Sequence, residues 1–61
     1  MKRIFVCLLG EWTQLTEGDT IFNTEPHTWL KENNIGEYEF LKILCGGTGY
    51  EIHKSHLQVM G

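Results

Sequence analysis

Apolar positions in the first third of the chain fall into short runs that are typical of strands. Residues 4–9 are apolar throughout, which favours a strand covered on both faces. Residues 11–16 alternate weakly between apolar and polar side chains, so they form a second strand or an ordered loop. After the turn residues 17–19, the run 20–22 indicates another short strand.

A helix signal follows these segments. Thr24 can accept a hydrogen bond from a free first-turn amide, and Pro26 lacks an amide where the helix needs none. The pattern predicts a helix from about 25 to 33, with Trp29 and Leu30 as its buried anchors. Because so short a helix is unstable in isolation, we expect it to pack onto a sheet.

The second half of the chain predicts a β-hairpin and a closing strand. Two strand-like runs, 37–45 and 50–53, flank a glycine-rich turn of four residues, 46–49. Residues 57–59 have the spacing of a last short strand.

Pairing Cys45 with Tyr50 sets the register of this hairpin and assigns its two faces. Either the helix covers the end of the outer face, or a bulge near Leu41 turns Tyr38 and Phe40 inward. The residues expected to face the core are Ile43, Cys45, Tyr50 and Ile52. Those expected to point away are Lys42, Leu44, Glu51 and His53, with Tyr38 and Phe40 on the same side.

Two stretches resemble the SH3-type small β-barrel. Residues 15–21 (LTEGDTI) resemble the L-x-x-G-D-x-I step after the long first loop of that fold, and residues 49–59 (GYEIHKSHLQV) resemble its finish. The resemblance implies a β-rich, partly open SH3-like barrel. The helix expected at about 25–33, between the second and third strands, departs from that fold. The alternative is an α+β fold with an antiparallel sheet and one packed helix. Residues 53–56 (HKSH) replace the Pro-x-x-Tyr of peptide-binding SH3 domains, so no proline-binding residue is carried over.

Composition bounds the class of protein. The chain has 61 residues, of which 41% are hydrophobic, and a formal net charge of −3, so we expect a single domain, 1–61, with a small core. The run at 4–9 is shorter than the core of a signal peptide, and no run approaches the roughly 20 apolar residues of a membrane span. Two cysteines are too few for a disulfide framework. These features predict a cytoplasmic protein.

Metal binding and catalysis find little support in the sequence. The spacing of the three histidines and two cysteines departs from the tight pairs of structural zinc sites, so a zinc-stapled module is our third hypothesis. Cys45 ends an apolar strand beside glycines, and the glycines at 46–49 lead into a strand instead of a helix. We therefore expect no catalytic residues and no cofactor.

Charge argues against nucleic acid as the main partner. Five basic residues face eight acidic ones, and such a field repels a phosphate backbone. A nucleic-acid-associated small barrel is accordingly our second hypothesis.

The leading hypothesis rests on large side chains that the strand phases leave outside, since exposed aromatic clusters mark partner interfaces. They are Trp12, Tyr38, Phe40 and Leu44. For Phe40 a core position is the favoured interpretation, and for Trp12 core and surface positions fit equally. The sequence thus predicts a non-enzymatic accessory protein, of bacterial or bacteriophage type, that acts through a protein partner or self-association.

Overall fold

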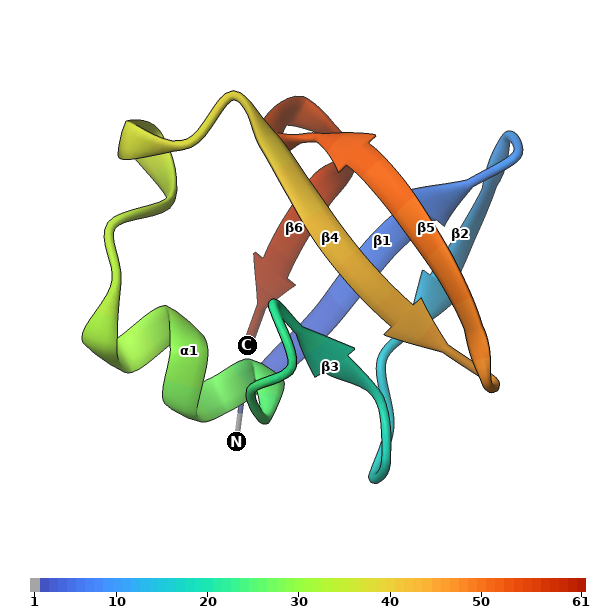
Figure 1. The fold of residues 1–61 in the computed structure, drawn as a ribbon, viewed down its shortest axis with the longest axis horizontal. Helices are drawn as coiled ribbons and strands as arrows, with labels where there is room; N and C mark the ends of the chain where they lie inside the picture. The colour runs from blue at the N-terminus through green and yellow to red at the C-terminus, as the bar shows by residue number, and fades with distance from the viewer. Residues whose placement is uncertain (1) are drawn as a thin grey trace.

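The computed structural model describes residues 2–61, which form two antiparallel three-stranded sheets and one short α-helix (Figure 1). The elements in chain order are β1 (Arg3–Leu8), β2 (Glu11–Gln14), β3 (Thr20–Ile21), α1 (Pro26–Glu32), the 3-10 turn η1 (Ile35–Glu37), β4 (Phe40–Cys45), β5 (Thr48–His53), the 3-10 turn η2 (Lys54–His56) and β6 (Leu57–Met60). The sheets have the orders β2-β1-β6 and β3-β4-β5. A small β-rich domain is therefore confirmed.

The first sheet is centred on β1, which pairs with β2 on one side and β6 on the other. Ile4, Val6 and Leu8 are buried, whereas Phe5 and Cys7 are only half-buried. The expectation that this run is covered on both faces was wrong, because within residues 2–61 no element covers the outer face of the sheet closely enough to bury Phe5 and Cys7. One apolar face of β1 consequently stays partly open to solvent.

The core lies between the two sheets, where the β4–β5 hairpin crosses over β1 and β6 (Figure 1). Burial of aliphatic side chains from both sheets provides the main stabilisation of so small a domain. The buried hydrophobic residues are Ile4, Val6, Leu8, Leu15, Ile21, Trp29, Leu41, Ile43, Ile52 and Leu57. The closing strand was predicted correctly: Leu57 enters the core, while Val59 stays exposed.

The β4–β5 hairpin turns over two residues instead of the predicted four. Gly46 and Gly47 have φ values of 60° and 82°, which a tight turn of this type requires, and Cys45 pairs with Thr48. The predicted pairing of Cys45 with Tyr50 was wrong by two positions. Since side chains alternate with a period of two, this shift leaves the face assignment intact. Ile43 and Ile52 are buried, and Cys45 and Tyr50 are half-buried.

The helix α1 lies where it was predicted, but its cap differs. The carboxylate of Glu25 accepts a hydrogen bond from the amide of Thr28 at 2.9 Å, so Glu25 is the N-cap in place of Thr24. The hydroxyl of Thr24 instead donates to the carbonyl of Phe22 at 3.4 Å. Of the two predicted anchors, Trp29 is buried and Leu30 is half-buried.

Three aromatic rings pack together and hold α1 against the second sheet. The centroid of the Trp29 ring lies 5.6 Å from that of Phe22 and 5.2 Å from that of Tyr38, and the Phe22 and Tyr38 centroids are 5.4 Å apart. Tilted pairs at these separations contribute beyond simple area burial. Phe22, Trp29 and Tyr38 are called the aromatic cluster below. None of the helices within residues 2–61 is long and apolar enough to cross a membrane.

Candidate protein-binding surface

The structure separates the four residues that were predicted to bind a partner. Trp12 on β2 is 49% exposed and Phe40 at the start of β4 is 53% exposed. Tyr38 belongs to the aromatic cluster, and Leu44 is half-buried on the outer face of β4. Trp12 and Phe40 therefore remain candidate surface residues, while Tyr38 is tied to the helix.

The expectation that Phe40 is a core residue was wrong. Leu41 is the residue of this pair that enters the core, so the alternation of β4 directs Phe40 outward. Its cross-strand neighbour is His53, whose ring meets it edge to face at a centroid distance of 5.5 Å. α1 covers the nearby Tyr38 but not Phe40, which leaves much of the Phe40 ring available for contact.

Phe40 lines a hollow of about 580 Å³ between the β1–β2 turn and β5, which we call the seam hollow. Its walls come from four segments that are distant in sequence. They are the end of β1 with the β1–β2 turn, the start of β4, the second half of β5, and η2. Its lining residues are Cys7, Leu8, Leu9, Gly10, Phe40, Tyr50, Glu51, Ile52, His53 and His56. The lining is mostly apolar or aromatic, with one carboxylate and two imidazoles.

Leu9 is the member of this site that sequence reasoning missed. It is 95% exposed and has a φ of 51°, and Gly10 follows with a φ of 85°. For a leucine the left-handed region is strained by roughly 1–2 kcal/mol, and asparagine or glycine normally occupies this turn position. Because residues 4–9 are all apolar, Leu9 was assigned to the strand, although Gly10 indicated a turn directly after it. Leu9 is thus an exposed apolar side chain on the wall of the seam hollow.

Trp12 is not among the residues that line the seam hollow. It pairs with Cys7 across β1 and β2, and opposed residues of antiparallel strands share a face. Cys7 itself lines the hollow. Of the predicted binding residues, Phe40 lines the seam hollow, whereas Trp12 lies with Cys7 on the face of the first sheet opposite the buried Leu8.

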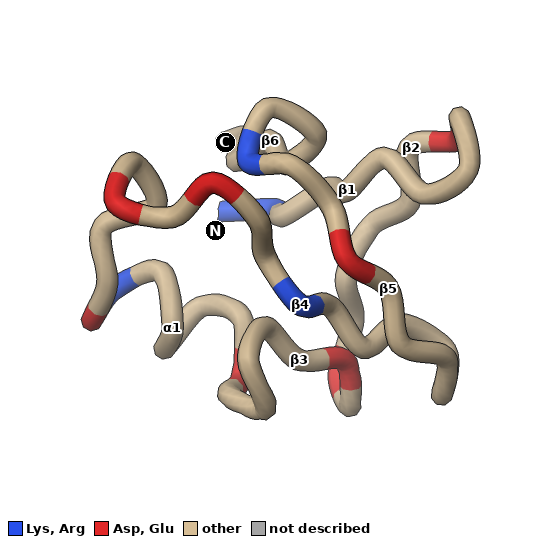
Figure 2. Tube along the Cα trace, turned by 45° about the horizontal axis from the view of Figure 1, so that its top comes forward, with Lys and Arg blue, Asp and Glu red and all other residues tan. Residues whose placement is uncertain are grey.

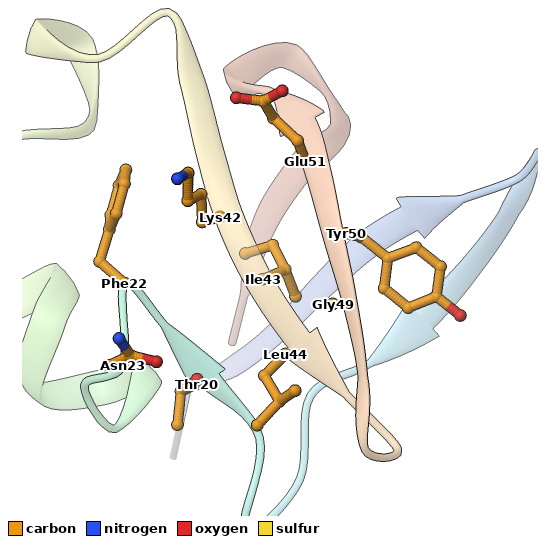
Figure 3. Close-up of a pocket in the computed structure, with 9 residues that line it drawn as sticks. All are labelled: Thr20, Phe22, Asn23, Lys42, Ile43, Leu44, Gly49, Tyr50 and Glu51. Atoms are coloured by element: carbon orange, nitrogen blue, oxygen red, sulfur yellow. The ribbon is translucent and has the colours of Figure 1, made fainter.

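A second hollow, of about 600 Å³, lies on the outer face of the β3-β4-β5 sheet (Figure 3). Leu44 lies in it, away from Phe40, so the structure does not bring these two predicted residues into one site. Lys42 and Glu51 are cross-strand partners here, and their opposite charges offset each other. The lining residues are Thr20, Phe22, Asn23, Lys42, Ile43, Leu44, Gly49, Tyr50 and Glu51.

Cys45 is poorly suited to nucleophilic chemistry. Burial, followed by the negative charge of Asp19, raises the pKa of Cys45 above its ordinary value. A thiol with a raised pKa stays protonated at neutral pH. Cys7 and Cys45 are both free and half-buried, and among residues 2–61 no group of three His, Cys, Asp or Glu side chains is placed to hold a metal ion.

The geometry defines a small β-rich domain with an open apolar hollow at the edge of one sheet. Comparisons of the chain with protein-family models, curated proteins and solved structures give no match.

Proposed function

We propose that the protein is a non-enzymatic interaction module that binds a protein chain through the seam hollow. The observation that carries the proposal is the placement of Leu9 and Phe40, both largely exposed, on the walls of one hollow. Burying an apolar side chain of this size stabilises a complex by roughly 1.5–3 kcal/mol. Two such anchors in one concavity account for a specific site better than scattered surface residues do.

An SH3-like, partly open barrel is the finer description of the fold that belongs to this proposal. Its support is the element order, in which η2 follows the β4–β5 hairpin and β6 returns to pair with β1. The free cysteines favour a reducing compartment such as the cytoplasm. Acidic and basic positions are interspersed along the trace without a basic row (Figure 2), and with the net charge of −3 this favours a protein over a nucleic acid as the partner.

A comparison of matched surface variants tests the binding site. We expect Phe40→Ser to reduce recovery of a specific partner from native-cell extract by about 10-fold or more, since the ring supplies an apolar anchor. Met60→Ser is the control, because Met60 is 54% exposed and does not line the seam hollow. Immobilised wild type and variants, read out by quantitative mass spectrometry, give the comparison.

Leu9→Ser and Trp12→Ala extend the same experiment. Leu9→Ser is expected to behave like Phe40→Ser, and Trp12→Ala shows how far the contact reaches along the first sheet. Equal recovery by wild type, Phe40→Ser and Leu9→Ser, with circular dichroism showing folded proteins, would reject the seam hollow as a binding site.

A further inference from the structure

β5 is an edge strand, and its outer edge is open. Among the strands of residues 2–61 it pairs only with β4, and Thr48, Gly49 and Glu51 are exposed. No backbone hydrogen bond outside the regular strands and helices of residues 2–61 involves Gly49 or Glu51. Such an edge is a template for pairing with another strand.

The two-residue turn determines which backbone groups point outward. In this kind of turn the amide of the fourth residue bonds to the carbonyl of the first, which makes Cys45 and Thr48 a hydrogen-bonded pair. Hydrogen-bonded and non-bonded pairs alternate along an antiparallel ladder. The backbone groups of Gly49, Glu51 and His53 therefore face away from β4.

Gly49 has no role within the chain that requires a glycine. Its φ is not in the left-handed region, and a Cβ added there would meet nothing within 4 Å. Glycine in the interior of a strand weakens it and often marks a place where another backbone approaches closely. The open edge and this glycine coincide at the same point on β5.

We propose that β5 of one copy of the protein pairs antiparallel with β5 of a second copy. This proposal rests on the proposed function and names the chain that covers the seam hollow. Tyr50, Glu51, Ile52 and His53 belong both to β5 and to the lining of that hollow. The ring of Tyr50 lies on the side of β5 away from β4 (Figure 3). A strand added at this edge therefore lies beside the hollow.

Charge favours one of two registers for the paired strands. In both registers the two copies of β5 are related by symmetry, and the outward-facing backbone groups of one copy lie opposite those of the other over most of the strand. One is centred on Glu51 and sets this carboxylate against its own copy, which is unfavourable. The other is centred on Tyr50, sets the two tyrosine rings against each other, and places each Glu51 opposite the Gly49 of the other copy. The second register avoids the repulsion.

Opposite charges at position 49 test this register, because a Cβ added there meets nothing within 4 Å. Gly49→Glu is expected to raise the dimer dissociation constant roughly two- to thirtyfold, since the symmetric dimer contains the like-charge pair twice. Gly49→Lys is expected to lower it by a similar factor. Sedimentation velocity over a concentration series at low salt measures both, and thermal unfolding checks that each variant is folded.

A backbone variant tests the pairing itself. Glu51→Pro removes an outward amide while keeping the β4–β5 ladder, and proline is tolerated at such an edge position. It is expected to abolish the dimer, whereas Glu51→Ala, which keeps the amide, retains it. A wild-type protein that stays monomeric at millimolar concentration overturns the proposal. So does a Glu51→Pro variant that dimerises like wild type, or a shift in the same direction for both position-49 variants.

The experiments can reject the β5 dimer and the seam-hollow binding site independently of each other. If the protein is monomeric but Phe40→Ser loses a captured protein that Met60→Ser retains, the second copy is excluded and the seam hollow stands as a site for a different chain. If Phe40→Ser and Leu9→Ser alter neither self-association nor capture, the proposed function itself is rejected.

Discussion

Asp19 is the buried charged residue of the part of the chain that the structure describes, and it joins two turns that are far apart in sequence. One carboxylate oxygen accepts hydrogen bonds from the amide and the hydroxyl of Thr16, at 2.8 and 3.3 Å. The other accepts from the amide of Gly46 at 3.1 Å. These bonds, led by that from the Thr16 amide, hold the pKa of Asp19 below its ordinary value of 3.8. The carboxylate thus ties the segment before β3 to the tip of the β4–β5 hairpin.

Asp19→Asn is expected to lower the free energy of unfolding by about 1–3 kcal/mol, because the amide group that replaces one oxygen cannot accept a hydrogen bond. Urea denaturation at neutral pH measures the change. Glu17→Gln, which removes the same charge from an exposed position of the same turn, is the control and should change stability by less than about 0.5 kcal/mol. Equal effects of the two substitutions would show that net charge, not the hydrogen bonds, is responsible.

At the scale of elements, the turn of the β1–β2 hairpin has a backbone conformation that its first residue adopts only with strain. Both residues of the turn have positive φ, and the first of them is Leu9. The neighbouring strands hold the hairpin, since β1 is paired on both sides. Their pairing offsets the strain at Leu9, so the side chain is held in an exposed position by the sheet behind it.

Leu9→Asn is expected to stabilise the protein by about 1 kcal/mol, because asparagine adopts the left-handed conformation more readily. The same substitution should weaken partner binding, since it removes an apolar anchor from the seam hollow. Thermal unfolding and the binding measurement are made on the same sample. A variant that is more stable and binds as well as wild type would show that the leucine contributes nothing to recognition.

The elements themselves could be predicted because their signals are local. Apolar runs located the strands, Pro26 located the helix, and the period of two assigned the faces of β4 and β5 even though the register was wrong. The register failed because the sequence Gly46 to Gly49 allows turns of two or four residues, and only the paired strands select between them.

The candidate binding surface could be predicted only in part, because burial depends on elements distant in sequence. Phe40 and Tyr38 share a strand phase in the sequence, yet α1 covers Tyr38, whereas Phe40 stays 53% exposed beside His53. The seam hollow forms where the β1–β2 turn lies beside β5. The local sequence pattern of either segment cannot predict that the two segments lie together. Trp12 could be recognised as a candidate because a glycine break isolates it from the strand before it.

At the scale of the whole molecule, α1 connects the two sheets. The aromatic cluster holds it to the second sheet, and His27 holds it to the start of the first. Nε2 of His27 lies 2.9 Å from the carbonyl oxygen of Lys2, and Nδ1 lies 3.1 Å from the carboxylate of Glu25. When the ring is protonated, both nitrogens donate. The hydrogen bond to Lys2, followed by that to Glu25, raises the pKa of His27 above 6.5.

Protonation of His27 is therefore expected to stabilise the fold. The contribution is fully present below the unfolded-state pKa near 6.5 and is lost as pH rises through the higher folded-state pKa. Denaturation measured between about pH 6 and 8 should show this loss, and His27→Gln should flatten that part of the profile. An identical profile for wild type and variant would contradict the assignment, and an NMR titration of the ring gives the direction of the pKa shift directly.

The pairing of β1 with β6 also affects the rate and order of folding. Arg3 lies opposite Met60, so the pairing of β1 with β6 joins segments near the two ends of the described chain (Figure 1). Closing so long a loop is entropically unfavourable until the core contacts form, and topologies dominated by distant pairings fold slowly. The β1–β2 and β4–β5 hairpins can form early from local contacts, but the first sheet is complete only when β6 docks. Until then β1 presents an unpaired edge, and the folding chain is most exposed to mispairing along that strand.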